Sequence, residues 1–457
     1  MVIVINIMII NNAVSLMEFL PFKNEASLGL NKNKILSEVV VNMIAHSNTV
    51  SNSKVAILYC IVSFFLFFEM AIQVSPSVMS SQLMHDFNIG TLGLGIMSGL
   101  YFYSYSAMQI PSGLLFDRFN PRIIITISIL FCVAGTLLLS VASNVYVGGV
   151  ARLLMGCGSA FAFVSVLVVT SDLFQPKYFA TMTGITQMLA AFGAMAGQMP
   201  ISAMTSYMGW RHTLLSLSVV GLILAIGVWN LLKYKKRDNS SFNKSHQMNI
   251  KENLRKIISQ SQTWYIALYA CLLWVPMSTF ASLWGVPFLV SAHHINQTLA
   301  AFLCSLMWLG LALASPLLGV LSSALNNRVL LLSLSAIVGG VAFGLVLEFN
   351  FSSLVIGLLL FFSGAACAGQ ALSFTVVKEN NPSSVTATAI AFNNMAVVIS
   401  GAIFQPLIGK LIESGQVSTS EHYNVYSFHN GLYIVLFSYV IAFLIAFFCI
   451  KEPKIAS

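Results

Sequence analysis

The ten residues GLLFDRFNPR, numbers 113–122, return in altered form 206 positions later as GVLSSALNNR, numbers 319–328. The step from glycine to arginine is nine residues in both copies, so Gly113 corresponds to Gly319 and Arg122 to Arg328. The same offset aligns three further pairs, namely Gly158 with Gly364, Pro200 with Pro406 and Gln187 with Asn393. The chain is therefore expected to contain two parallel structural repeats.

Apolar runs surround both copies. Of the 457 residues, 57% are hydrophobic and 8% are charged, whereas roughly 25% of the residues in soluble domains are charged. Because a membrane-spanning helix takes about 20 mostly apolar residues, this composition fits about twelve spans. The sequence predicts an all-α polytopic membrane protein of two parallel six-helix repeats, with spans near 56–78, 92–115, 122–142, 145–172, 179–206, 212–232, 264–290, 298–321, 328–347, 351–376, 383–411 and 430–450.

The same composition excludes several classes of protein. It leaves no room for a soluble enzyme, a disordered chain or a single-span receptor with a large ectodomain. The chain lacks G-x-x-x-x-G-K-[ST], H-E-x-x-H and G-x-S-x-G, so we expect neither an ATP-driven pump nor a membrane enzyme. The seven cysteines lie in apolar runs without a Cys-x-x-Cys or Cys/His cluster, and neither a metal site nor a cofactor is expected.

Positive charge is distributed unevenly between the two expected sides of the membrane. If both termini are cytoplasmic, 19 of the 22 Lys and Arg residues fall in cytoplasmic segments, while Arg211 and Lys410 fall at outer ends. Cytoplasmic loops are enriched in Lys and Arg, which fits this orientation. The tails are rich in Asn, Ile and Lys, which suggests a bacterium with AT-rich codons. We therefore expect a multi-pass protein of a bacterial inner membrane, with both termini inside and no nucleic acid partner.

A polar stretch divides the chain. We expect an N-terminal half at 54–232, a cytoplasmic central loop at 233–262, a C-terminal half at 263–452 and a tail at 453–457. Residues 1–53 begin with an apolar stretch that is too short to span. They are expected to form a cytoplasmic extension, or to precede a later true start such as Met43; an amphipathic surface segment is the alternative.

Two motifs resemble the major facilitator superfamily, and the likeness covers about 54–452. GLLFDRFNPR is similar to the family's G-x-L-x-D-R-x-x-x-R loop between spans 2 and 3. RLLMGCGSA, 152–160, is similar to its R-x-x-x-G-x-G-x-A motif in span 4, and GAMAGQMP, 193–200, looks like a loose version of its span-5 motif. The resemblance implies a helix-packing role for Gly156, Gly158, Gly193, Gly197 and Pro200.

The loop motif also implies a conformational latch formed by Gly113, Asp117, Arg118 and Arg122. Gly113 is expected to let spans 2 and 11 approach closely, and a carboxylate at Asp117 suits the N-terminus of span 3. Arg118 and Arg122 could pair with Asp117 or with carbonyls of span 11, which would favour the outward-open state. The alternative is that the arginines only anchor the topology. Ser323 replaces the acid in the second copy, so the latch is expected on one side only.

Ionisable side chains inside a span are costly and usually functional. Glu69 is the acid near the middle of a span, and Arg152 is the mid-span base. At about 1.5 Å per residue they lie about 14 Å and 10 Å below the outer surface, so we expect them to face each other or to share a water-filled cavity. Glu69 is interpreted as a protonation site coupled to substrate movement. It could instead neutralise Arg152 as a structural pair, or contact the substrate.

Polar and aromatic side chains within the spans are candidates for lining a substrate cavity, although each could instead form an interhelical hydrogen bond. They are Gln73, Gln187, Gln198, Trp274, Trp284, Gln370, Asn393, Asn394 and Gln405. Tyr101, Tyr103 and Tyr105 of span 2 point to different faces, so only part of that set is expected to reach the interior.

These observations favour a secondary active transporter that moves a small polar metabolite by alternating access, with its site between the halves. QVSPSVM, WGVPFLV and GAIFQPLIG resemble a bacterial branch similar to the lysosomal dipeptide transporters, which implies proton symport of amino acids or dipeptides. An uncoupled facilitator, or an exporter of sugars, organic acids or drug-like molecules, is the alternative. The expected partners are the substrate, a proton and the lipid bilayer, for a monomer without a cofactor.

Overall fold

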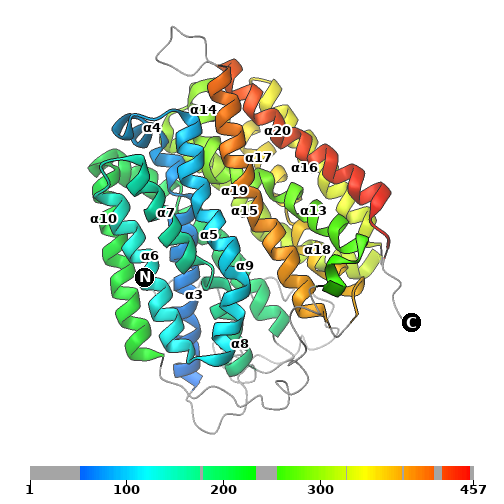
Figure 1. Ribbon diagram of the computed structural model, residues 1–457. Coiled ribbons are helices and arrows are strands. Elements are labelled where there is room, and N and C mark those ends of the chain that lie inside the picture. The colour runs from blue at the N-terminus through cyan, green and yellow to red at the C-terminus, as the bar shows by residue number, and fades with distance from the viewer. Residues whose placement is uncertain are drawn as a thin grey trace, which may run out of the picture.

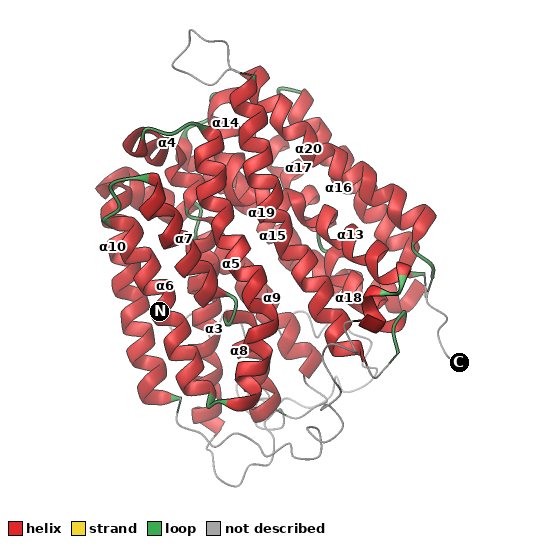
Figure 2. Ribbon diagram, in the orientation of Figure 1, coloured by secondary structure: helices red, strands yellow, loops and turns green. Residues whose placement is uncertain are grey.

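The computed structural model describes residues 52–174, 179–232, 255–325, 327–382, 385–415 and 425–452. Within these ranges the chain consists of helices joined by short loops, without a strand (Figure 2). The all-α prediction is confirmed. All but two residues of the expected N-terminal extension, most of the expected central loop and the expected C-terminal tail lie outside the described residues.

The first half packs eight helical segments into six spans (Figure 1, blue to green). Span 4 is divided by a turn, and the last segment bends at Gly209, whose φ of 77° is left-handed and favours glycine. That bend separates the outer end of span 5 from span 6. The segments are α3 (Asn52–Val74), α4 (Pro76–Phe87), α5 (Thr91–Arg118), α6 (Pro121–Ser140), α7 (Val145–Ser159), α8 (Ala162–Leu173), α9 (Phe179–Ala196) and α10 (Met199–Leu231).

The second half repeats this plan, with two π-helical segments (Figure 1, green to red). One of these, η2, begins at Pro276 in the middle of span 7, where every residue of the segment is buried. The segments are α13 (Ser261–Val275), η2 (Pro276–Trp284), α14 (Gly285–His293), α15 (Gln297–Leu325), α16 (Arg328–Glu348), α17 (Ser353–Ala366), α18 (Gly369–Glu379), α19 (Thr386–Ser414), α20 (Val425–Leu444) and η4 (Ile445–Cys449).

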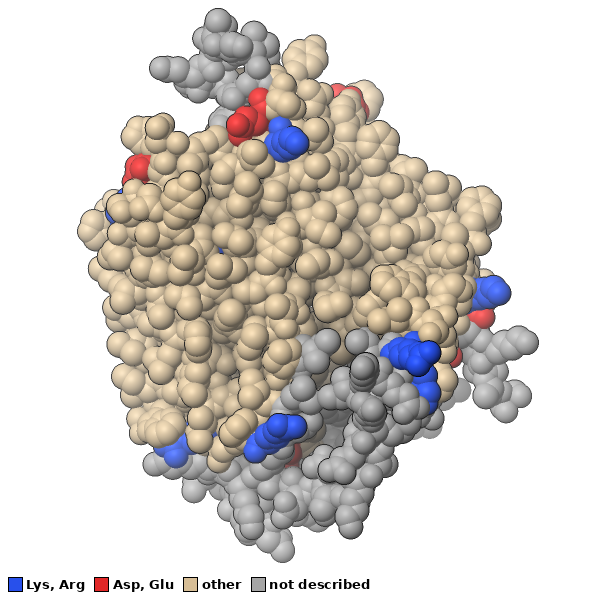
Figure 3. Space-filling view, in the orientation of Figure 1, with Lys and Arg blue, Asp and Glu red and all other residues tan. Residues whose placement is uncertain are grey.

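Ten described segments are long and apolar enough to cross a membrane. One of them, Ile185–Leu231, has 47 residues and contains spans 5 and 6 on either side of Gly209. Helix α5 supplies span 2 with 28 residues, although its Tyr, Ser and Gln side chains make it less apolar. The described helices therefore make twelve spans. Figure 3 shows a broad uncharged band between two charged rims.

Matching caps start the third span of each half. Asn120 accepts a hydrogen bond from the backbone N–H of Arg122 at the start of α6, and Asn327 accepts one from that of Leu330 at the start of α16.

The register between the two repeats shifts after this point. Gly156 faces the backbone carbonyl of Tyr101, whereas the corresponding carbonyl of Met307 is faced by Gly364. Gly364 is thus the counterpart of Gly156 rather than Gly158, because span 10 begins two residues later in its repeat than span 4.

The halves meet along α5 and α19. Close approach occurs at Gly95, where a Cβ atom would lie 2.6 Å from the Gln405 carbonyl oxygen, and at Gly99, where it would lie 3.2 Å from the Pro406 ring. A Cβ atom at Gly113 would meet no described atom within 4 Å. The close approach expected at Gly113 therefore lies nearer the other end of the helix, where glycine lets the two backbones touch.

Candidate functional site

Arg152 lies at the centre of the first half, on α7, and is 1% exposed. Its guanidinium donates hydrogen bonds to the carbonyls of Ile72 (3.2 Å) and Gln73 (3.3 Å) at the end of α3. In a continuous helix the Ile72 carbonyl would bind the N–H of residue 76, but Pro76 has none. The proline therefore leaves this carbonyl without its helical donor, and it accepts from the Ser75 hydroxyl (3.1 Å) as well as from Arg152. The negative end of α3 thus binds the buried cation.

Tyr101 connects this arginine to the buried acid. The Arg152 Cζ atom lies 4.5 Å from the centre of the Tyr101 ring, within the range of a cation–π contact. The Tyr101 hydroxyl lies 2.5 Å from Oε1 of Glu69 and 3.4 Å from Oε1 of Gln73. Tyr105 packs beside Tyr101, whereas Tyr103 is 48% exposed, so the interior-facing part of the tyrosine set is identified.

Glu69 and Arg152 belong to one cluster but form no ion pair among the described residues. Glu69 is also 1% exposed, and its Oε2 has no hydrogen-bond partner. Arg152 Nε likewise has none. Helices α3, α5 and α7 thus hold an acid, a phenol and a guanidinium with hydrogen-bonding capacity left unused, which is expensive in a dry interior. The sequence placed the two charges at similar depth, but it did not identify Tyr101 as the bridge.

Two buried glutamines converge on the π-helical segment. Gln198 donates to the Ala281 carbonyl across the two halves, and Gln405 donates to the Ser278 carbonyl at 2.7 Å. The Oε1 atom of each glutamine has no partner. The i→i+5 geometry of a π-helix redirects carbonyls, and such segments often mark functional sites. The backbone of η2 is therefore held by amides from both halves.

The other cavity candidates occupy different environments. Asn393 donates to Ser373 within the second half, and Asn394 donates to Gln109 across the halves, both at 2.9 Å. Trp284 is buried and donates to the Gln405 carbonyl at 3.3 Å, so it belongs to the η2 cluster. Three candidates join none of these clusters: Trp274 packs its half-buried ring on Trp308, Gln187 is half-buried, and Gln370 is buried at the start of α18.

The small residues named for packing lie at helix contacts, with one exception. Gly156 faces α5 and Gly158 faces α6, while Gly193 and Gly197 face the backbone of α3 at Phe67 and Ala71. Pro200, in contrast, is exposed at the start of α10.

The expected latch on the first half stays a prediction. Arg118 is exposed, and the side chain of Asp117 lies outside the described set. The Arg122 Cζ atom lies 4.0 Å from the centre of the Trp229 ring on span 6. The second copy, expected to lack a latch, has Arg328 bound to both carboxylate oxygens of Glu379 at 2.6 and 2.7 Å. Its acid comes from the end of α18, which the motif could not indicate.

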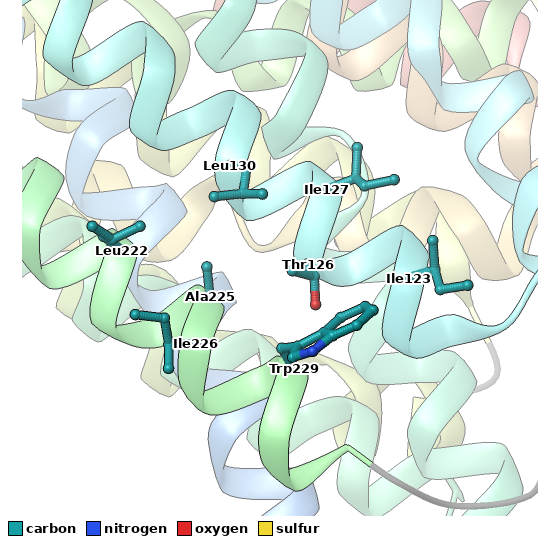
Figure 4. A pocket seen from close by; sticks show the side chains of 8 residues that line it. All are labelled: Ile123, Thr126, Ile127, Leu130, Leu222, Ala225, Ile226 and Trp229. Atoms are coloured by element: carbon teal, nitrogen blue, oxygen red, sulfur yellow. The ribbon is translucent and has the colours of Figure 1, made fainter.

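A groove of about 500 Å³ lies away from this cluster, between α6 and α10 (Figure 4). Its walls are outward-facing apolar side chains, so it is not the substrate site. No group of three or more His, Cys, Asp or Glu side chains that could hold a metal occurs in the described ranges.

Known proteins share both sequence features and the fold of this chain. The family model of the Major Facilitator Superfamily matches residues 59–405 and 275–457. A bacterial homologue of the lysosomal transporter Spinster, solved inward-facing and unoccupied, superposes with a TM-score of 0.73 at 15% identity, over 89% of this chain and 100% of that one. A D-xylose–proton symporter gives 0.67 at 13% identity, over 88% and 98%. These two likenesses show the fold.

Curated relatives are more similar in sequence over shorter stretches. An uncharacterised transporter of Bacillus subtilis is 25% identical over 36% of this chain, and a probable L-galactonate transporter of Escherichia coli is 26% identical over 36%. These matches span 38% and 36% of the relatives' own lengths. A probable galactarate/D-glucarate transporter of Escherichia coli is 22% identical over 74% of this chain and 82% of its own. The chain belongs to the Major Facilitator Superfamily.

Proposed function

We propose that the protein couples a proton gradient to movement of a small organic anion, with Glu69 as the protonation site and Arg152 as the group that attracts the anion. The observation that carries this proposal is the buried Glu69–Tyr101–Arg152 cluster, in which acid and base both retain an unpartnered atom. A carboxylate that can be protonated and a guanidinium that lacks a carboxylate partner are the two groups that such coupling requires.

The substrate class follows from charge and from the relatives. Probable transporters of L-galactonate, sulfoacetate and galactarate/D-glucarate are among them, and each of these compounds carries a carboxylate or sulfonate. A single buried guanidinium matches the one carboxylate of a sugar-acid monoanion such as L-galactonate, whereas a dianion such as a sugar phosphate or an aldarate would require a second cation. The neutral amides around η2 can hydrogen-bond to hydroxyl groups.

Amino acids or dipeptides are the second candidate. The names of these three transporters point to acid sugars and a sulfonate, which lowers the rank of the amino acids and dipeptides expected from the sequence. They are retained because Glu69 and Arg152 occur in one cluster and could bind the two charged ends of a zwitterion.

Alternating access would act through contacts between the halves. Gln198 reaches the Ala281 carbonyl, and Gln297 at the start of α15 reaches the Val78 carbonyl on α4. The second contact lies on α4, which meets α14 at one end of the molecule (Figure 1). Opening that end requires this hydrogen bond to break, and it forms again when the end closes.

The orientation and the chain divisions stay proposals. Lys and Arg gather along the lower rim in Figure 3, which favours a cytoplasmic position for that rim under the positive-inside rule. Both termini would then be cytoplasmic in a bacterial inner membrane. The halves at 54–232 and 263–452 and the loop between them keep the bounds expected from the sequence.

The test is uptake into proteoliposomes with and without an inward proton gradient. The panel comprises L-galactonate, D-glucarate, sulfoacetate, an amino acid and a dipeptide. We expect one organic anion to accumulate above its external concentration only when the gradient is present. Equilibration without accumulation would identify a facilitator, and accumulation of the peptide alone would replace the substrate class.

A further inference from the structure

A lipid-facing groove lies between α6 and α10, in spans 3 and 6. Figure 4 shows side chains of both helices bordering it, with the Trp229 ring at one end. Thr126 is its one hydroxyl-bearing wall residue, and that hydroxyl already donates to the Arg122 carbonyl at 2.8 Å. The lining residues are Ile123, Thr126, Ile127, Leu130, Leu222, Ala225, Ile226 and Trp229. The groove therefore offers apolar surface only.

The groove lies in the membrane-spanning part of the fold, and this location determines what can occupy it. The wall residues Ile127 and Ile226 are 48% and 54% exposed, and both lie within spans. In a bilayer such outward-facing surface contacts hydrocarbon rather than water. Along α6 the groove runs from Ile123 to Leu130, about 10 Å of helix at 1.5 Å per residue. A stretch of acyl chain has the chemistry and the length to occupy it.

A cation stands at the inner end of the groove. Arg122 belongs to the first turn of α6, and its guanidinium stacks on Trp229, which lines the groove near the end of α10. Its Nε is buried and has no hydrogen-bond partner. The equivalent Arg328 of the second half differs, because Glu379 engages it through two oxygens. Among the described side chains, Arg122 has no corresponding carboxylate.

From this combination we infer that the α6–α10 groove binds one phospholipid with an anionic headgroup, its phosphate on Arg122 and an acyl chain along the apolar walls. The phosphate supplies an acceptor for the Arg122 Nε, which has none among the described residues. Trp229 lies at the depth where indole rings favour the membrane interface. Anionic lipids are concentrated in the cytoplasmic leaflet, on the side that the distribution of Lys and Arg assigns to this end of the helices.

Native mass spectrometry of the full-length protein tests this inference, after incubation with equal amounts of phosphatidylglycerol and phosphatidylcholine that share the same acyl chains. We expect one retained phosphatidylglycerol in preference to phosphatidylcholine. Arg122→Gln should lower that preference about fivefold, as for loss of one cation at a membrane surface. Arg118→Gln removes an exposed arginine of the same loop and should leave the preference unchanged.

Filling the groove tests the acyl-chain half of the inference. Ala225→Trp, or the milder Ala225→Leu where the former alters the size-exclusion profile, should reduce retention of both lipids. Val338→Trp on the outer face of α16 is the matched control and should retain them. A preference that survives Arg122→Gln, or adducts that are insensitive to both Ala225 variants, would overturn the assignment.

Discussion

In the first half, Gly156 packs on the backbone of Tyr101, and Arg152 lies one helical turn before that glycine. In the second half, Gly364 packs on Met307, and the residue one turn before it is Leu360. Both glycine contacts hold a span-4-type helix against a span-2-type helix. The scaffold is therefore repeated, while the phenol and the guanidinium of the first half are replaced by two buried apolar side chains.

The interior of the second half uses neutral groups at its helix contacts. Ser278 bonds to Ser400 at 2.8 Å, and Asn393 donates to Ser373. Because a charge in mid-membrane costs about 2.5–3.5 kcal/mol, keeping the charges in one half confines that cost. The comparison teaches that a repeated fold can place a buried acid and a buried guanidinium in one half and use neutral, hydrogen-bonded groups at the same level of the other.

Converting the first half toward the second should have the largest effect. Arg152→Leu removes the guanidinium donors to the Ile72 and Gln73 carbonyls and the group proposed to attract the anion. Breaking a buried charged contact costs about 3 kcal/mol, so uptake should fall about 100-fold. Arg152→Lys keeps the positive charge but not the two guanidinium N–H donors, so it should recover part of the lost uptake. Uptake by Arg152→Leu within twofold of wild type would show that the asymmetry carries no function.

Removing the acid separates coupling from binding. Glu69→Gln keeps the shape and the hydrogen bond to Tyr101 but cannot exchange a proton. Accumulation driven by a proton gradient should be lost, while exchange of labelled for unlabelled substrate should stay within about threefold, since bonds to neutral groups differ little in net energy. Both rates are measured in the same proteoliposomes. Gradient-driven accumulation by the variant would remove Glu69 as the protonation site.

The shared scaffold predicts matched losses of stability. Alanine at Gly156 or at Gly364 would push a Cβ atom into a backbone carbonyl, and each should cost about 1–3 kcal/mol. Gly113→Ala and Gly319→Ala are the controls, because a Cβ atom at either position meets no described atom within 4 Å. Thermal unfolding in detergent measures all four. A loss at Gly156 or Gly364 no larger than that of the two controls would contradict the shared backbone contact.

The sequence predicted the helical plan because hydropathy and charge asymmetry are sums over many residues. It placed twelve spans and two repeats, and the family resemblance followed from two motifs. It missed the register shift between spans 4 and 10, since an offset measured at one loop carries no information about later insertions. It also placed the α5–α19 contact at Gly113, although backbone proximity at Gly95 depends on how the two helices cross.

The site was harder to predict, because contacts there join distant segments. Depth arithmetic brought Glu69 and Arg152 to one level, but the interposed Tyr101 ring depends on the rotation of α5. The partner of Arg152 is a pair of carbonyls at the end of α3, one of them left without its helical donor by Pro76, and backbone acceptors leave no sign in a search for opposite charges. Glu379 was missed for the related reason that it lies 51 residues from Arg328.

Tyr101 offers a finer test of the bridge. Tyr101→Phe removes the hydrogen bond to Glu69 and keeps the ring on Arg152, so kcat should fall about fivefold to tenfold with KM little changed, as for the loss of one buried bond to a charged group. Tyr101→Met reproduces the residue of the second half, removes the cation–π contact as well, and should raise KM too. Equal kinetics for the two variants would show that the ring contact with Arg152 contributes nothing.

The smallest effect is expected at the outer end of the first half. Asp86 accepts hydrogen bonds from His85 and from Trp210 Nε1 (3.0 Å), and Arg211 lies 3.5 Å away. These contacts, the hydrogen bond from His85 first, lower the pKa of Asp86 below its ordinary 3.8. A lowered pKa in the folded state means that the contribution to stability is present above the unfolded-state pKa and is lost as pH falls through the folded-state pKa.

Asp86→Asn should therefore cost less than about 1 kcal/mol at pH 7, because the pair is partly exposed to solvent. The difference from wild type should shrink below pH 3.8. Glu379→Gln provides the contrast from the second half, since Arg328 is more buried and is bound through two oxygens, and it should cost more. Thermal unfolding midpoints of the two variants, recorded from pH 7 to pH 3, decide the order. A larger loss of stability for Asp86→Asn would contradict this order. It would mean that the contacts of Asp86 with α10 stabilise the first half more than the Arg328–Glu379 pair stabilises the second.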